Sequence, residues 1–196
     1  MTQNVCLITG VGPGTGSALA RRFAEGYQVA MLARNSERLA ALESEIEDAR
    51  AFPCDVREPI ALRACYEKVV AEMGAPSVIL HNAVGGAFGD FLSIEPAVLQ
   101  RNFEINTLAL LHLARLAAPA MIEAGRGAIL CTGNTSTYRG KANFAGFAPT
   151  FVGSLATTRA SFPTPWSMPC RRPSPRVEGR SSFTQSRPFK TRWDGS

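Results

Sequence analysis

The fold is decided by the stretch Val5-Cys6-Leu7-Ile8-Thr9-Gly10-Val11-Gly12-Pro13-Gly14-Thr15-Gly16. Its first four residues are a short, continuous apolar run, which is typical of a strand buried on both faces. A helical pattern with Leu19 and Phe23 on one face follows directly. Glycines between a strand and a helix permit a tight turn and a close approach of the two elements. We therefore expect this stretch to be the first strand–turn–helix unit of a parallel sheet.

The same alternation continues as far as Thr150. Further short apolar runs occur at 29–32, 78–80 and 128–131, and 51–54 is a weaker candidate because Pro53 lacks a ladder donor. Between the runs lie helical stripes made of Leu39, Leu42 and Ile46; Leu62, Cys65, Tyr66, Val69 and Met73; and Leu99, Phe103, Asn106, Leu110, Leu113 and Ala117. Five strands and four helices in this order predict an α/β fold with a doubly wound parallel sheet in three layers.

The last part of the chain has a different composition. The 196 residues carry a net charge of +5, but residues 151–196 alone carry +6 and the first 150 carry −1. The same 46 residues include seven Arg, six Pro and eight Ser, and their apolar residues follow no helical or strand spacing. Such a segment buries too little apolar surface to offset its chain entropy. We predict one domain at 1–150 and an irregular or disordered Arg/Pro/Ser-rich tail at 151–196.

The composition and the apolar segments also predict where in the cell the protein is found. Five cysteines without short-spaced pairs argue against a disulfide scaffold or a metal site and favour a reducing compartment, so we expect a cytoplasmic protein. No basic region precedes the first apolar run, so a secretory signal is not expected. The longest apolar stretch, 108–122, is short and includes His112 and Arg115, so we expect no membrane span.

The glycine-rich turn points to a phosphate ligand, because an exposed helix N-terminus offers unpaired N–H groups and partial positive charge. Its glycines fit T-G-x-x-x-G-x-G rather than G-x-G-x-x-G. This pattern resembles that of the short-chain dehydrogenases/reductases. Two further motifs support the resemblance: Cys54-Asp55-Val56, similar to the family's D-V, and His81-Asn82-Ala83-Val84, similar to N-N-A-G.

The resemblance covers residues 4–150 and implies a Rossmann-like NAD(P)-binding domain that is incomplete on its C-terminal side. It implies a dinucleotide cofactor held by Gly10, Gly14, Thr15, Gly16, Arg34, Asp55, Val56, Asn82 and Ala83. Family members transfer a hydride between the nicotinamide and a small-molecule carbonyl or alcohol. They are usually homo-oligomers, an assembly that we doubt here because the helix used for it is incomplete.

Asn106 matches the family's catalytic Asn, which holds a water in a proton relay and kinks its helix. It lies on the apolar stripe, one turn from Phe103 and Leu110, where a buried amide needs hydrogen-bond partners. The alternative is a structural role, as a buried Asn whose amide is hydrogen-bonded within the core.

The end of the second predicted strand reads Leu32-Ala33-Arg34-Asn35, without the acid that binds the ribose hydroxyls of NAD. The Arg34 guanidinium is suited to a 2′-phosphate. We therefore expect NADP rather than NAD, the alternative being a solvated Arg34 beside Ser36 as a helix N-cap.

The family's catalytic Tyr-x-x-x-Lys pair is missing. Phe147 stands at the Tyr position and Phe151 at the Lys position, and neither moves a proton. Asn134 falls at the position of the family's Ser and retains a hydrogen-bond donor. Ser136 and Tyr138 are weaker substitutes for the lost acid, and we expect His81 and His112 to be structural.

The resemblance therefore leaves competing hypotheses. The first is an NADP-dependent oxidoreductase with impaired catalysis. The second is a non-catalytic dinucleotide-binding protein, or a truncated or frameshifted product that departs from its family near Thr150. Nucleic-acid binding through the basic residues 171–176 is not favoured, because no aromatic platform accompanies them.

Overall fold

The computed structural model describes residues 4–139 and 143–152. Its single sheet has five parallel strands in the order β3-β2-β1-β4-β5. The strands are β1 (Val5–Thr9), β2 (Gln28–Ala33), β3 (Ala49–Pro53), β4 (Pro76–His81) and β5 (Ala128–Cys131). The helices are α1 (Thr15–Ala24), α2 (Ser36–Glu45), α3 (Pro59–Met73), α4 (Pro96–Phe103) and α5 (Ala109–Glu123), with the π-helix η1 (Glu104–Leu108) and the 3₁₀-helix η2 (Thr135–Thr137).

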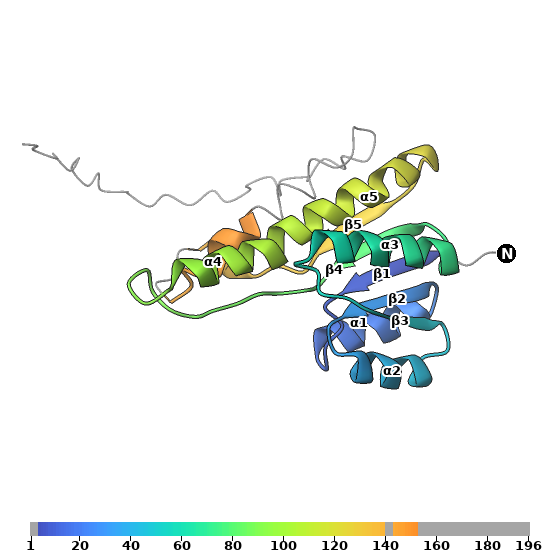
Figure 1. Ribbon diagram of the computed structural model, residues 1–196, viewed down its shortest axis with the longest axis horizontal. Coiled ribbons are helices and arrows are strands. Elements are labelled where there is room, and N and C mark those ends of the chain that lie inside the picture. Colours follow the sequence, from blue (N-terminus) through green and yellow to red (C-terminus); the bar gives the residue numbers. More distant parts are fainter. Residues whose placement is uncertain (1–3, 140–142, 153–196) are drawn as a thin grey trace, which may run out of the picture.

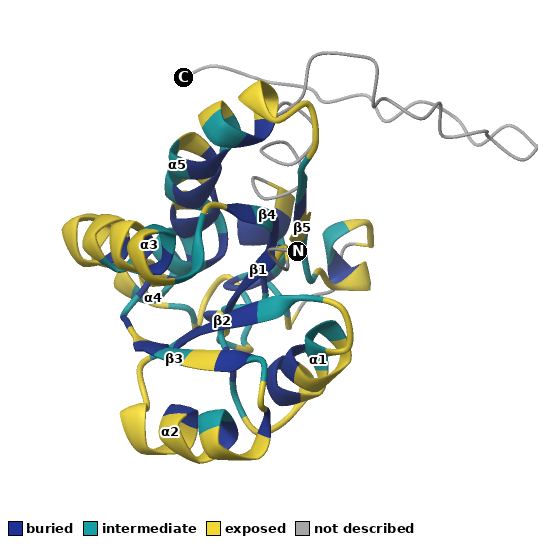
Figure 2. Ribbon diagram, turned by 90° about the vertical axis from the view of Figure 1, so that its right-hand side faces the viewer, coloured by how far each residue is buried: buried dark blue, intermediate teal, exposed yellow. Residues whose placement is uncertain are grey.

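Helices cover both faces of the sheet, which confirms the doubly wound, three-layer fold (Figure 1). Successive residues of β1 serve opposite cores, as the pleat requires. Leu7 packs in the cluster under α3 and α5, whereas Cys6 and Ile8 pack in the cluster under α1 and α2. The central strands are buried along their length, and exposed positions lie on the outer faces of the helices (Figure 2).

The strand 51–54 is confirmed in a slightly shifted position, as β3 at the sheet edge. Pro53 is the last residue of β3. Because β3 is an edge strand with β2 as its one neighbour in the described sheet, the missing N–H of Pro53 removes no hydrogen bond to a second strand. The other edge of the sheet, among the described residues, is β5. The chain is helical again at 148–152, and the rest of the predicted 151–196 tail lies outside the described residues.

α4, η1 and α5 form one continuous helix from Pro96 to Glu123, the most apolar helix of the described chain. By length and composition alone it is sufficient to cross a membrane. Its apolar residues have a different explanation in the fold, because Leu110, Leu113 and Ala117 are buried in the core cluster shared with α3 and the sheet. The helical stripe predicted from the sequence is therefore the core-facing side of this helix.

Two glycines set the distance between β1, α1 and the end of β4. Gly10 has φ +70°, and a Cβ there would lie 2.4 Å from the backbone of Ala83. A Cβ on Gly16 would lie 2.4 Å from the Gly10 carbonyl oxygen. Gly12 differs, because nothing lies within 4 Å of a Cβ built there. The turn therefore requires glycine at positions 10 and 16 on steric grounds, but not at position 12.

We expect Gly10→Ala to lower the free energy of unfolding by more than about 2 kcal/mol, because it adds backbone strain to a backbone clash. Gly12→Ala, two residues away in the same turn, is the matched control and is expected to change stability by less than about 0.5 kcal/mol. Urea unfolding of the full chain measures both. Equal effects of the two substitutions would contradict the steric interpretation.

Candidate functional site

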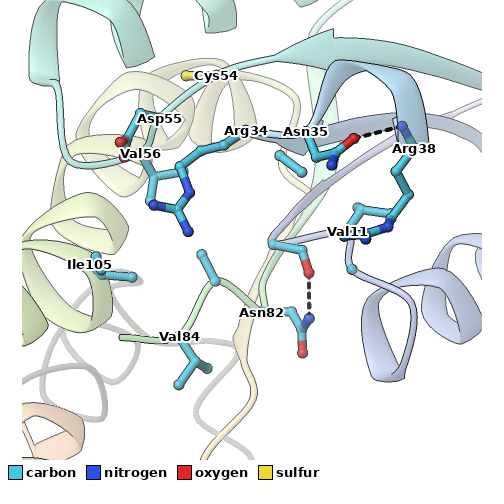
Figure 3. A pocket seen from close by; sticks show the side chains of 14 residues that line it. Val11, Arg34, Asn35, Arg38, Cys54, Asp55, Val56, Asn82, Val84 and Ile105 are labelled. Carbon is cyan, nitrogen blue, oxygen red and sulfur yellow. Dashed lines mark hydrogen bonds between the residues drawn. The ribbon is translucent and has the colours of Figure 1, made fainter. Parts of the chain in front are cut away.

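A large cavity with convergent polar groups lies at the carboxyl ends of the strands. It has a volume of about 500 Å³ and opens beside β1. At β1 the direction in which successive strands are added to the sheet reverses, because β2 lies on one side of β1 and β4 on the other. Open parallel sheets bind ligands at such a switch point. Figure 3 shows its lining, which comes from the regions that follow β1, β2, β3 and β4 and from η1: Gly10, Val11, Gly12, Ala33, Arg34, Asn35, Arg38, Cys54, Asp55, Val56, Asn82, Ala83, Val84 and Ile105.

Six of the predicted cofactor residues line this cavity together: Gly10, Arg34, Asp55, Val56, Asn82 and Ala83. Gly14, Thr15 and Gly16 lie next to it at the start of α1 rather than in its wall. Among the described residues no side chain caps that helix end, and the Ser17 N–H donates to the Gly12 carbonyl oxygen at 3.0 Å, so the N–H groups of Thr15 and Gly16 remain for a ligand. Asn82 fixes the turn from the opposite side, because its Nδ2 donates to the Gly10 carbonyl oxygen at 2.9 Å (Figure 3).

His81 is buried, and both of its ring nitrogens form hydrogen bonds within the fold, which agrees with the expected structural role. Its Nε2 donates to the Ile105 carbonyl oxygen at 2.9 Å, because a carbonyl only accepts. Its Nδ1 therefore accepts from the Thr9 hydroxyl at 2.8 Å, and that hydroxyl accepts from the Ala83 N–H at 3.3 Å. The imidazole thus connects the ends of β1 and β4 to the π-helix η1. Burial lowers the pKa of His81 to about 4.

The β2–α2 turn presents two cations to the cavity. Arg34 directly follows β2, and Arg38 lies in the first turn of α2; both line the cavity (Figure 3). Both are exposed, and neither forms an ion pair within 4–139 and 143–152. Asn35, rather than Ser36, is the N-cap, and its side chain accepts from the Arg38 N–H at 2.8 Å. The expected N-cap Ser36 is therefore wrong, and Arg38 was not predicted, although its spacing of four residues from Arg34 was a usable signal.

Asp55 is held in its charged form at the far wall of the cavity. Arg57 donates to both carboxylate oxygens, with Nη2 at 2.7 Å from Oδ2, and this hydrogen bonding lowers the pKa of Asp55. The charge of Arg34 acts in the same direction. The carboxylate is therefore an acceptor for donors on a bound ligand at any pH near neutrality.

Asn106 is 1% exposed and lies within η1, so the helix departs from α geometry at the residue where the resemblance implies a kink. Its Oδ1 accepts from the Gly85 N–H at 2.7 Å, and its Nδ2 donates to the Gly85 carbonyl and to Thr150 Oγ1. The amide oxygen and nitrogen of Asn106 therefore both have hydrogen-bond partners, and they link the loop after β4 to the segment 148–152. Its role in a proton relay stays a prediction.

The positions of the missing catalytic pair are occupied by packed aromatic rings. Phe147 and Phe151 are both buried, with ring centroids 4.7 Å apart, and Phe147 also stacks on Phe88 at 6.0 Å. Asn134 lies elsewhere, in a separate cavity of about 310 Å³ lined also by Tyr138 and Phe151. The Oδ1 of Asn134 caps η2 by accepting from the Ser136 N–H at 2.9 Å. The structure therefore places Asn134 beside Phe151 but not in the wall of the large cavity.

A crevice of this kind, with a glycine turn on one side and cations on the other, defines a dinucleotide-binding fold. The family model for short chain dehydrogenases matches residues 4–154. The chain belongs to the short-chain dehydrogenase family.

Similar proteins include both NADP- and NAD-linked enzymes. The chain is 31% identical to an NADP-dependent 3-hydroxy acid dehydrogenase of Salmonella typhi over 67% of its own length, and 30% identical to a ketoacyl reductase of Nostoc over 82%. It spans only 54% and 58% of those two relatives.

Among solved structures, a metagenomic short-chain oxidoreductase in complex with NADP matches with TM-score 0.74 and 32% identity, covering 80% of this chain and 75% of that one. NAD⁺-bound xylitol dehydrogenase matches with TM-score 0.72 and 29% identity, covering 78% and 61%.

The buried imidazole predicts a pH-dependent stability. A His whose folded pKa is about 4, against 6.5 for the free side chain, binds a proton more readily when unfolded. The free energy of unfolding should therefore fall as the pH drops through this window, by about 3 kcal/mol in all from His81. Denaturant unfolding between pH 7 and 4 tests this, with His81→Asn as the comparison. Parallel curves for the two proteins would contradict the assignment.

Proposed function

We propose that this chain binds NADP in the large cavity, in preference to NAD, and that its hydride-transfer chemistry is impaired. The observation that supports the cofactor is the pair Arg34 and Arg38, two guanidinium groups at the β2–α2 turn with no ion-pair partner among the described residues. A 2′-phosphate offers the bidentate acceptor that such groups favour. An acid that would select NAD is absent from the lining at this turn.

The residues present fit a dinucleotide at each wall. Nothing lies within 4 Å of a Cβ built on Gly12 or Gly14, so the turn leaves open space beside its backbone. The uncapped start of α1 would hold the pyrophosphate through N–H groups, and Asp55 would accept from the adenine amine. Asn82 and Ala83 would form the wall toward the nicotinamide. When bound, the nicotinamide supplies or accepts the hydride.

The proton half of the reaction is what the chain lacks. Reduction of a carbonyl needs a group that delivers a proton to the developing alkoxide, and the buried rings of Phe147 and Phe151 hold none to give. Asn134 retains an amide to orient a carbonyl oxygen, but an amide does not supply the proton. The residual activity would then rest on positioning by the cavity and on protons from water.

A purely non-catalytic dinucleotide-binding protein is the second candidate. It is favoured by a cluster of aromatic rings in which Phe88, Phe144 and Phe147 contact one another and Phe151 contacts Phe147. Phe147 and Phe151 thus make apolar contacts at the positions of the family's proton-transfer groups. A small carbonyl or alcohol substrate belongs to the first candidate only. A cytoplasmic location and the absence of membrane and nucleic-acid partners are part of the proposal for both. The homo-oligomer that is usual for the family is not part of the proposal.

The double variant Arg34→Ala/Arg38→Ala tests the cofactor assignment. Loss of a phosphate-binding guanidinium pair should weaken NADPH binding by more than about tenfold while leaving NADH binding within about twofold. Isothermal titration calorimetry measures both ligands. Arg63→Ala, a change at an exposed Arg on α3 outside the lining, is the control. Equal losses for NADPH and NADH would remove the NADP preference.

Restoring the proton-transfer pair tests the catalytic half. We expect Phe147→Tyr/Phe151→Lys to raise NADPH-dependent reduction of aldehydes or ketones by about 10²-fold or more over the unmodified chain, because general acid catalysis contributes on that scale. Absorbance of NADPH at saturating cofactor measures it. Phe144→Tyr, a hydroxyl added to a neighbouring ring, is the control. A wild-type rate that already matches the double variant would contradict the impairment.

A further inference from the structure

A groove of about 550 Å³ lies between helices α3 and α5 and shares no described lining residue with the large cavity. The two helices pack beside each other, with Leu62 of α3 and Leu113 of α5 in the same core cluster (Figure 2). The described lining residues are Pro59, Ile60 and Arg63 of α3 and His112, Arg115 and Leu116 of α5. Four of these residues are exposed and two are half-buried. The function proposed above makes no use of this α3–α5 groove.

Each helix presents basic and apolar side chains to the groove from one face. Pro59 and Arg63 are four residues apart on α3, and His112, Arg115 and Leu116 are spaced by three and four residues on α5. Residues at these spacings are neighbours on a helix surface. Three of the six described lining residues are basic and three are apolar, so the groove offers both kinds of surface to one ligand.

The basic side chains of the groove have little acidic compensation. The described lining contains no Asp or Glu. The Nη1 of Arg63 lies 3.9 Å from Oε1 of Glu67, which is too long for a hydrogen bond. Neither His112 nor Arg115 has an ion-pair partner in the part of the chain that the structure describes. The groove therefore has a positive potential, which favours an anion.

The apolar part of the wall indicates that this anion carries a hydrocarbon group. Ile60 is 86% exposed, and Leu116 is half-buried beside it in the lining. A bare inorganic anion would leave this surface in water, whereas a chain laid along it would remove apolar area from water on both partners. Concave sites with apolar walls and a few convergent polar groups are typical of small-molecule binding.

We propose that the α3–α5 groove binds a free amphiphile that carries a phosphate monoester on an apolar chain. The guanidinium groups of Arg63 and Arg115 suit the bidentate geometry of phosphate oxygens, and His112 adds an N–H donor. A phosphate monoester has three terminal oxygens, so it serves donors from both helices at once, whereas a carboxylate has two. The apolar chain would lie along Ile60 and Leu116.

Isothermal titration calorimetry of the full chain with octyl phosphate, below its micelle concentration, tests the groove. We expect octyl phosphate to bind at least about tenfold more tightly than octanoate, inorganic phosphate or octanol, because each of these lacks part of the interaction. Octanol or inorganic phosphate that binds as tightly as octyl phosphate would overturn the amphiphile, and octanoate that does so would overturn the phosphate head.

Removal of the two groove arginines locates the ligand. Arg63→Gln/Arg115→Gln should weaken octyl phosphate binding by about tenfold or more. Arg50→Gln/Arg101→Gln removes the same charge at two exposed arginines outside the groove lining and is the matched control, expected to bind within about twofold of the unmodified chain. Circular dichroism verifies that both variants are folded. Absence of octyl phosphate binding to the unmodified chain, or equal losses in the two variants, would overturn the proposal.

A bilayer is the other source of a phosphate monoester on apolar chains. We expect no flotation of the protein with phosphatidylcholine vesicles that contain phosphatidic acid, because the head and chain of the ligand would both lie within the groove. Flotation that Arg63→Gln/Arg115→Gln abolishes would assign the groove to a membrane surface and overturn the free amphiphile.

The large cavity also carries arginines, so a further arm separates the groove from the proposed dinucleotide site. Saturating NADPH and the Arg34→Ala/Arg38→Ala variant should each leave octyl phosphate binding within about twofold. Competition by NADPH would place octyl phosphate in the large cavity, which overturns the groove and supports the cofactor site. Groove-dependent octyl phosphate binding by a chain that binds no NADPH supports the groove and counts against the cofactor site.

Discussion

The backbone contact between the β1–α1 turn and the end of β4 is the constraint on which the rest of the structure depends. Gly10 passes so close to Ala83 that no Cβ fits between them, and Asn82 holds the Gly10 carbonyl from the same side. Because β4 lies beside β1 in the sheet, this contact forms at the point where the chain order reverses. The β1–α1 turn packs directly against the end of β4, and the cavity lies between these two segments and the β2–α2 turn.

From that contact a line of buried hydrogen bonds runs toward the segment at the family's catalytic positions. Thr9 and His81 join the ends of β1 and β4 to the π-helix through the Ile105 carbonyl. One residue later, Asn106 joins that helix to Gly85 and Thr150. Each donor in the line has an acceptor, so the segment at 148–152 is positioned by the same network that shapes the cavity.

Most of the fold was predictable because its signals are local. Continuous apolar runs marked the buried strands, the 3.6-residue stripes marked the helix faces, and the glycine spacing marked the first turn. The strand at β3 was harder, since Pro53 suits only an edge and the edge is a property of the whole sheet. Arg38 was missed and Ser36 was taken for the Asn35 cap, because the residue that caps a helix and the side chains that face a cavity depend on local backbone geometry.

The two halves of the proposed site, an adenine half and a chemical half, are encoded in physically different ways, which separates binding from chemistry. The adenine half depends on backbone turns, on Asp55 and on two arginines, all carried by elements that fold around the intact strands β1 to β4. The proposed chemical half depends on single side chains at positions 134, 147 and 151, and at position 147 the loss of one hydroxyl, from Tyr to Phe, removes a proton donor without disturbing the backbone. Phenylalanine at 147 and 151 even adds apolar contacts, so the hydrogen bond from Asn106 to Thr150 persists without the acid and base. A fold of this type therefore retains a dinucleotide crevice after its proton-transfer groups are gone.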